Sequence, residues 1–396
     1  MSVSRLTRSP CYHSVMLVDR MEVINFRNLE GSLRFGPGHN IFYGDNAQGK
    51  TNWLEALYLV GTTKSFRTKQ LRDLIRFGAG NCIVRAEVSQ GALTKQQQIL
   101  VSETSKEMYV NGKREAVTRY LGSLDVVVFS MEGMAIVRGE PGERRRFLDR
   151  GILSITPSYL GTLSEYNHVI KQKNRLLAEA AASNAPEGYL PQVEAWNEQL
   201  IGLGTEIHNA RNHYVARLNQ VLGDKDQGRA IFGGEGTSVR YRSQLEGKGD
   251  LNDYAKVFRE RLEVRMEAEL ASGHSLLGPH RDELEILIDG REAARFGSAG
   301  QQRSALFILD LAQVYVYNCV YEESPVLLID DIDAELDRGR IEAVLSELEG
   351  RVQTFISTSR RGIANRYQDR ANVYLVERGQ VPGESRPLAH QDAASS

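Results

Sequence analysis

An eight-residue stretch near the N-terminus, residues 44–51, has the pattern G-x-x-x-x-G-K-[ST]. It lies between an expected strand, residues 40–43, and an expected helix, residues 52–61, which is the context that a phosphate-binding loop requires. We predict that its small residues let backbone N–H groups face the phosphates, that Lys50 reaches the β and γ oxygens, and that the Thr51 hydroxyl binds Mg²⁺. The predicted nucleotide-binding residues of the loop are Gly44, Asp45, Asn46, Ala47, Gln48, Gly49, Lys50 and Thr51.

An apolar run that ends in two acids, residues 325–331, predicts a buried parallel strand that delivers carboxylates to one edge of a sheet. Asp330 would hold Mg²⁺, and Asp331 would orient or deprotonate the attacking water. With Lys50, these are the predicted catalytic residues. The alternative is a pair of acids that merely cap the next helix.

The segment Ser298-Ala299-Gly300-Gln301 resembles the S-x-G-Q signature of ABC ATPases, placed at the start of an expected helix. That resemblance implies that Ser298, Gly300 and Gln301 bind the γ-phosphate of a nucleotide held by another copy of the chain, so that ATP joins two copies into a dimer. The alternative is a plain serine N-cap.

Three further segments resemble the RecF family, whose ATPase heads are related to those of SMC proteins. They are NFRNL near the start, RGEPGERRRFLD at 138–149 and GPHRDE at 278–283, and the similarity extends from Glu22 to Val381. The resemblance implies a weak ATPase that dimerises on ATP, clamps duplex or gapped DNA at single-strand junctions, and works with RecR, RecO and RecA. There are two departures from the usual patterns, because Ala47 replaces a glycine of the RecF family and Asp331 replaces the glutamate of most ABC ATPases, which suggests slow hydrolysis.

The overall composition favours an ordinary globular protein, the three widely spaced cysteines fit a reducing cytoplasm, and the RecF resemblance implies association with the nucleoid. Lys plus Arg total 49 against 51 Asp plus Glu, so the net charge of −2 provides no general attraction to DNA or to a membrane surface. No apolar run reaches the roughly 18 residues of a membrane span. The three cysteines have no spacing typical of a zinc site or a disulfide framework.

Any DNA contact must therefore come from local basic clusters. The candidates are Lys64, Arg67, Lys69 and Arg72 in one segment, and Lys171 and Lys173 in an expected helix. An ordinary solvated surface is an equal alternative for each cluster. A structural role is also open for the arginine run at 144–146, and His280 is more typical of a structural histidine than of a catalytic one.

The pattern of elements predicts an α/β fold, an ABC-type ATPase head with a mixed sheet and an inserted short helical arm. The head would comprise residues 21–155 and 275–382, and the arm residues 156–274. Residues 81–129 are expected to form an antiparallel meander that ends in the strand DVVVF. Residues 1–20 and 383–396 are expected to be disordered.

Three other functions remain compatible with these motifs. A stand-alone ABC ATPase could work with a partner nuclease in defence, and a P-loop could transfer phosphate to AMP. A third possibility is a DNA-binding switch that holds ATP and scarcely hydrolyses it.

Overall fold

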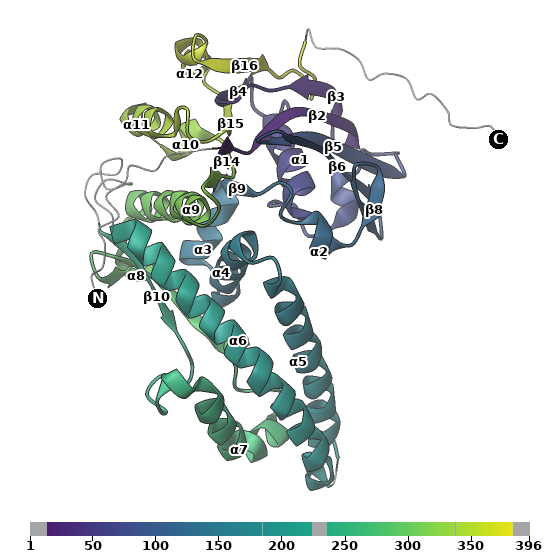
Figure 1. Ribbon diagram of the computed structural model, residues 1–396, viewed down its shortest axis with the longest axis vertical. Coiled ribbons are helices and arrows are strands. Elements are labelled where there is room, and N and C mark those ends of the chain that lie inside the picture. The colour runs from purple at the N-terminus through teal and green to yellow at the C-terminus, as the bar shows by residue number, and fades with distance from the viewer. Residues whose placement is uncertain (1–13, 184, 224–235, 337, 383–396) are drawn as a thin grey trace, which may run out of the picture. The chain divides into compact units, whose positions relative to one another are not determined.

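The structure is a computed structural model, which describes residues 14–183, 185–223, 236–336 and 338–382. The described chain divides into two compact units (Figure 1). The first unit contains the residues up to Gly133 and those from Asp310 onward, and the second unit is Met134–Leu309.

The first unit contains a five-stranded parallel sheet in the order β16-β4-β15-β14-β9. Its strands are β4 (His39–Tyr43), β9 (Val126–Phe129), β14 (Val326–Ile329), β15 (Thr354–Thr358) and β16 (Ala371–Leu375). Every residue of β14 is buried, as is typical of a parallel strand. Because β4 and β14 run in the same direction, the segments that follow them lie at one edge of the sheet.

A six-stranded antiparallel sheet lies in the same unit, in the order β3-β2-β5-β6-β7-β8. Its strands are β2 (Leu17–Phe26), β3 (Leu29–Arg34), β5 (Asn81–Gln90), β6 (Leu93–Ser102), β7 (Lys106–Val110) and β8 (Lys113–Glu115). The predicted meander is correct for β5 to β8, and Asn111 and Gly112 turn between β7 and β8 with positive φ angles of 50° and 76°.

The prediction that the meander ends in the strand DVVVF is wrong. This strand, β9, pairs in parallel with β14 and belongs to the other sheet. Its continuous apolar run is typical of a parallel sheet, whereas a half-exposed meander strand alternates apolar and polar residues.

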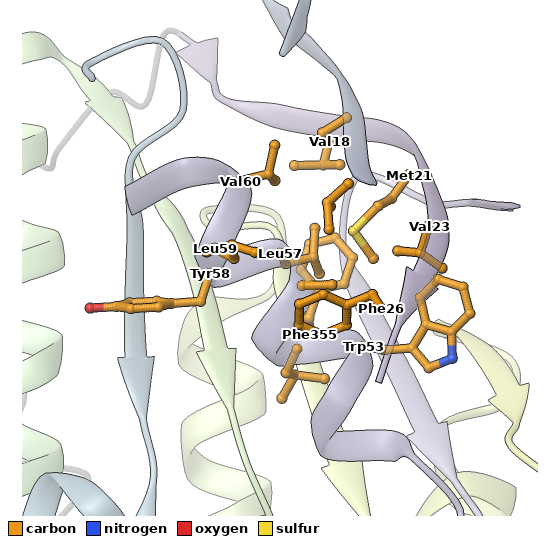
Figure 2. Close-up of a cluster of buried hydrophobic side chains, with 14 of the residues drawn as sticks. Val18, Met21, Val23, Phe26, Trp53, Leu57, Tyr58, Leu59, Val60 and Phe355 are labelled. Carbon is orange, nitrogen blue, oxygen red and sulfur yellow. The ribbon is translucent and has the colours of Figure 1, made fainter. Parts of the chain in front are cut away.

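Helix α1 (Lys50–Thr62) supplies the largest part of the core in this unit. All residues from Trp53 to Gly61 are buried, so no face of this stretch is left to solvent. Figure 2 shows Val18 and Met21 of β2 gathered with Trp53 and Leu57 of α1, and Phe355 of β15 joins the same cluster. The helix therefore packs against both sheets, which fixes the position of its N-terminus.

The remaining elements of the first unit are short. They are β1 (Ser14–Val15), paired in parallel with β13 (Glu323–Ser324), the helices α2 (Val117–Tyr120), α10 (Ile332–Glu335), α11 (Arg338–Leu348) and α12 (Arg361–Tyr367), and the 3₁₀ turns η1 (Leu71–Leu74) and η2 (Met131–Gly133).

The second unit is mainly helical (Figure 1). Its helices are α3 (Met134–Arg138), α4 (Pro141–Ile155), α5 (Tyr159–Ala181), α6 (Leu190–Gly223), α7 (Tyr254–Ser272) and α8 (Ala293–Phe296), with the turns η3 (Pro186–Tyr189), η4 (Leu251–Asp253) and η5 (Pro279–Arg281). The long helices α5, α6 and α7 pack against one another. A small sheet of β10 (Thr237–Arg242), β11 (Glu283–Ile288) and β12 (Arg291–Glu292) completes the unit.

Helix α9 (Ala299–Tyr321) begins in the second unit and ends in the first. Among the described residues it is the one helix that is long and apolar enough to cross a membrane by length and composition. Of its most apolar stretch, 72% is buried inside the structure, and the core helix of a globular protein has the same properties.

The structure differs from the predicted boundaries in two places. Residues 14–20 form β1 and the start of β2, where a disordered extension is expected, because Met16 and Val18 are fully buried in the core. The predicted arm, residues 156–274, lies within the second unit, which also includes α3, α4, α8 and β11. Residues 1–13 and the predicted disordered tail, 383–396, lie outside the described residues.

Candidate nucleotide-binding site

The loop between β4 and α1 is shaped by two glycines. Gly44 has a φ of 150°, and a Cβ atom at this position would lie 2.5 Å from the carbonyl oxygen of Val376. Gly49 immediately precedes α1 and has a φ of 108°. The loop thus turns tightly into the N-terminus of a 13-residue helix, whose partial positive charge favours a phosphate group.

Ala47 has a left-handed backbone conformation, with a φ of 62°. This is the condition under which alanine is strained in place of glycine, at a cost of about 1 kcal/mol. The loop adopts this conformation despite its Cβ atom.

Lys50 is buried, with 7% of its surface exposed. Its Nζ atom donates to the carbonyl oxygens of Gly44 and Asp45, both at 2.8 Å, so the side chain folds back over the loop. Burial lowers the pKa of Lys50, and the nearby Asp331 carboxylate opposes this effect. A phosphate oxygen would offer the ammonium a charged acceptor, which forms a stronger hydrogen bond than a carbonyl.

Asp330 connects three segments at the edge of the parallel sheet. Its Oδ1 atom accepts hydrogen bonds from Thr51 Oγ1 at 2.9 Å and from Ser357 Oγ at 2.6 Å. Burial raises the pKa of Asp330, and the two hydroxyl donors oppose the rise. A hydroxyl and a carboxylate are the oxygen ligands that Mg²⁺ prefers, so Thr51 and Asp330 have the donor atoms expected of its ligands.

Asp331 has a left-handed conformation, with φ 51° and ψ 50°, at the start of α10. Its N–H donates to Ser357 Oγ at 2.7 Å, and its carboxylate makes no capping hydrogen bond to the helix. Burial and the neighbouring Asp333 raise the pKa of Asp331, while Lys50 opposes the rise. The alternative of a plain capping acid therefore does not describe Asp331, and a carboxylate with a raised pKa is suited to accept a proton from water.

The end of β15 supplies hydroxyl groups that are not among the predicted site residues. Ser357 bridges Asp330 and Asp331, whereas Thr358 Oγ1 and Ser359 Oγ donate to Asp333 at 2.6 and 2.8 Å. Burial tends to raise the pKa of Asp333, but these hydrogen bonds bring it below its ordinary value. The signal for Asp333 was its place two residues after the acidic pair.

A turn at Glu377–Gln380 also contacts the loop. The N–H of Gly379 donates to the carbonyl oxygen of Gln48 at 2.6 Å, and the N–H of Arg378 donates to its side-chain Oε1 at 2.7 Å. Gly379 has a φ of 82°, and a Cβ there would lie 2.2 Å from the carbonyl oxygen of Asn28. The hydrogen bond between Arg378 and Gln48 links residues 330 positions apart, so no local pattern predicts it.

The S-x-G-Q segment lies in the second unit, at the N-terminus of α9. Ser298 and Gln301 form a capping box, in which the N–H of Gln301 donates to Ser298 Oγ at 3.2 Å and the N–H of Ser298 donates to Gln301 Oε1 at 2.8 Å. Ser298 therefore acts as a helix N-cap, as the alternative interpretation of this segment predicted. Ser298 and Gly300 are nevertheless exposed, so the N-terminus of α9 is open to an approaching anion.

The basic segment after α1 is exposed at all four predicted positions, Lys64, Arg67, Lys69 and Arg72. Arg67 is also tied to α1, because its Nη1 atom lies 3.4 Å from Glu55 Oε2 and donates to Asn52 Oδ1 at 2.8 Å. Glu55 is fully buried and pairs with Arg27 at 2.5 Å. The segment is thus held against the helix that begins at the phosphate-binding loop.

The prediction that Lys173 contacts DNA is wrong. Its side chain is completely buried, and Nζ lies 2.6 Å from Glu269 Oε2 on α7. Residues two positions apart on an α-helix point about 200° apart. Lys171 therefore remains exposed on α5 while Lys173 faces the interior of the unit.

The arginine run and the Gly-Pro-His-Arg segment have structural partners in the second unit. Arg144 Nε pairs with Glu283 at 2.7 Å, and Arg145 Nη1 donates to the carbonyl oxygen of Asp282 at 2.8 Å. His280 Nδ1 lies 2.7 Å from the hydroxyl of Tyr166. Burial lowers the pKa of His280 to about 4, which keeps the ring neutral in this contact at neutral pH.

Comparison with known proteins places these features in a family. The family described as the RecF/RecN/SMC N-terminal domain matches residues 17–381. The DNA replication and repair protein RecF of Lactobacillus acidophilus is 32% identical over 372 residues, which are 92% of this chain and 98% of that protein. RecF of Halothermothrix orenii is 34% identical over 349 residues, or 87% of this chain and 92% of that protein.

Solved structures agree with this assignment. The recombination mediator protein RecF with ATP, from the RecFOR pathway, superposes with a TM-score of 0.82 at 29% identity, over 93% of this chain and 99% of that one. An Smc head domain from Pyrococcus furiosus has a TM-score of 0.52 at 16% identity, over 92% of this chain and 95% of that one, and shares the fold alone.

The mixed architecture, the phosphate-binding loop and the acidic strand end define an ATPase head of the ABC type. Its parallel sheet brings Thr51 and Asp330 together, and its second unit carries the S-x-G-Q helix. Within this class the chain belongs to the RecF family of DNA replication and repair proteins.

Proposed function

We propose that the chain is an ATP-dependent DNA-binding protein that holds ATP and Mg²⁺ at the loop of residues 44–51. The observation that supports this best is the 2.9 Å hydrogen bond between Thr51 and Asp330, because it joins the two motifs that bind nucleotide and metal in P-loop ATPases. The RecF relative of known structure that holds ATP supports the same ligand.

Each polar residue of the site has a distinct role in this proposal. Lys50 binds the β and γ phosphate oxygens, and Thr51 and Asp330 bind the Mg²⁺ that would neutralise them. Asp331 accepts a proton from the attacking water, or orients that water, with its backbone held by Ser357. An aspartate is one methylene shorter than a glutamate, so hydrolysis is slow and ATP acts as a timer.

ATP also controls assembly in this proposal. Ser298, Gly300 and Gln301 of one copy bind the γ-phosphate of the nucleotide held by a second copy, at the exposed N-terminus of α9. The γ-phosphate then favours the dimer, because it is bound by both copies only in that state. Its loss by hydrolysis removes this differential affinity.

DNA would bind to the basic segment that includes Lys64, Arg67, Lys69 and Arg72, with Lys171 of α5 as a further contact. All are exposed. By the family relationship, the preferred DNA is a gap or a single-strand junction. The proposed protein partners are RecR, with RecO and RecA in the same pathway. The proposed location is the cytoplasm, at the nucleoid.

The experiment that tests this proposal is DNA binding by the full chain with ATP and Mg²⁺ over a range of salt concentrations. Lys50→Ala should abolish ATP binding and with it ATP-dependent DNA binding. The double change Lys69→Ala and Arg72→Ala should preserve ATP binding and make the salt slope shallower by about 1.8, since each neutralised phosphate contributes about 0.9. DNA binding that is independent of both ATP and salt would contradict the proposal.

A further inference from the structure

The turn that precedes β5 presents a bare aromatic ring. Phe77 is fully exposed, and its ring is the most exposed large hydrophobic side chain among the described residues. A phenylalanine buries much more surface than most side chains when it is covered, so an uncovered ring is unfavourable in water. Scattered exposed apolar residues are normal, so exposure alone does not give Phe77 a role.

The backbone of this turn is firmly held. The N–H of Ala79 donates to the carbonyl oxygen of Arg76 at 3.0 Å, and Gly78 at the third position has the positive φ, 84°, that a type II turn requires there. Below it, the N–H of Arg76 donates to the carbonyl oxygen of Asn25 at 2.8 Å. Phe77 is thus projected outward by a defined turn.

The base of the turn is anchored in the core of the same unit. Leu74 is 2% exposed, and its carbonyl oxygen accepts a hydrogen bond from the N–H of Arg27 at 2.8 Å. Arg76 donates to the carbonyl oxygen of Leu29 at 2.7 Å and pairs with Glu30 at 3.0 Å. The charge of Arg76 is therefore used to fix the turn, while the ring next to it is left uncovered.

The basic residues that precede Phe77 in the chain differ in whether they form ion pairs. Arg67 and Arg76 pair with glutamates, but within the described residues no ion pair engages Lys64, Lys69 or Arg72. All three are exposed, and Arg72 lies only five residues before Phe77. The segment thus combines unneutralised positive charge with a rigidly presented aromatic face.

This combination matches nucleic acid better than protein. Lysine is depleted in protein interfaces. Proteins that bind single strands, in contrast, combine a cationic surface for the phosphates with aromatic rings on which bases stack. Bases inside a continuous duplex have their faces covered by their neighbours, whereas the first unpaired base at a gap does not.

We infer that Phe77 stacks on an unpaired base where a single strand meets a duplex, while Lys64, Lys69 and Arg72 bind the adjacent phosphates. This inference rests on the proposed DNA binding and adds a physical source for a preference for junctions. The cations attract any DNA, and the ring discriminates in favour of DNA that has an accessible base face.

The test compares Phe77→Ala and Phe77→Trp with the wild-type full chain, in ATP and Mg²⁺, by fluorescence anisotropy on a gapped DNA and on a continuous duplex. Phe77→Ala should lose about 5- to 150-fold in affinity for the gapped DNA, as expected for one base stack, and less than about 2-fold for the duplex. Phe77→Trp should bind both like the wild type. Leu93→Ala, another exposed apolar residue of the same unit, is the matched control and should change neither affinity.

A 2-aminopurine placed at the first unpaired position reports the stack directly. The wild type and Phe77→Trp should quench its fluorescence, and Phe77→Ala should not. Equal affinity of wild type and Phe77→Ala for the gapped DNA, or an equal loss on both DNAs, would overturn the inference while leaving the proposed function in place. The inference would also be overturned if Phe77→Ala lost binding to another protein while its affinity for both DNAs stayed equal to that of the wild type. Failure of the wild type to bind either DNA would overturn the proposed function and this inference together.

Discussion

Ser357→Ala removes the hydroxyl that joins the two acids of the site. Ser357 is 1% exposed, donates to Asp330 at 2.6 Å and accepts from the N–H of Asp331 at 2.7 Å. A hydrogen bond to a charged partner contributes about 1.5–3 kcal/mol and a neutral one about 0.5–1.5 kcal/mol. The free energy of unfolding of the chain should therefore fall by about 2–4 kcal/mol. The pKa of Asp330 should rise further, because one of the two donors that favour its ionised form is lost.

Two measurements check this prediction. Urea unfolding without nucleotide should show an earlier midpoint with an unchanged slope. Calorimetric titration with ATP and Mg²⁺ should show an affinity loss that is larger at pH 6 than at pH 8, because Asp330 must ionise to bind the metal. Ser357→Thr, which keeps a hydroxyl, should recover part of both losses.

The matched control is Ser324→Ala. Ser324 is fully buried in the same unit, and its hydroxyl accepts a long hydrogen bond from Asn318 Nδ2 at 3.4 Å. This change should cost less than about 1 kcal/mol and leave the affinity for ATP unchanged. If Ser357→Ala costs no more than Ser324→Ala, the bridge between the two acids does not stabilise the site.

Three other changes test separate parts of the structure. Burial lowers the pKa of His208 to about 4 from an ordinary 6.5, so the unfolded chain binds this proton first as the pH falls. The free energy of unfolding should therefore fall by up to about 3 kcal/mol between pH 7 and pH 4. In urea unfolding measured over this pH range, His208→Phe should lose most of that pH dependence. Lys173→Met leaves the buried Glu269 without its partner and should cost about 3–5 kcal/mol in the same assay, with an unchanged affinity of the folded protein for DNA. Ala47→Gly relieves about 1 kcal/mol of left-handed strain at φ 62° but adds a similar entropic cost of folding. The urea midpoint of this variant should therefore stay close to that of the wild type. A fall of more than about 1 kcal/mol in its free energy of unfolding would contradict the strain at this position.

The parts of the site that sequence reasoning identifies are those whose chemistry is local. The loop at 44–51 needs a strand, small residues and a helix start in succession, and all three are visible in the sequence. Likewise, the run Val326–Ile329 is apolar at every position, as a strand buried on both faces requires. The contact of Ser357 with Asp330 depends instead on the register between β14 and β15, in which Ile329 lies opposite Ile356. No local pattern specifies that register.

The incorrect predictions for Lys173 and for the strand DVVVF also result from contacts between residues that are distant in the chain. Spacing alone groups Lys171 with Lys173, but which face of α5 is buried depends on Glu269 of α7, almost a hundred residues away. Similarly, β9 follows the antiparallel meander in sequence, yet its partner is β14, some two hundred residues later. In each case the deciding contact is distant in the chain, and the apolar or charged character of the segment is compatible with either environment.

We propose that ATP joins two copies of the chain through the exposed helix start at Ser298. Light-scattering mass measured with and without ATP and Mg²⁺, and repeated with a gapped DNA, tests it most directly. We expect a monomer without ATP, a dimer with ATP that forms more readily on DNA, and a persistent ATP-bound dimer for Asp331→Asn. A monomer under every condition, including Asp331→Asn with ATP, would contradict the nucleotide site shared between two copies.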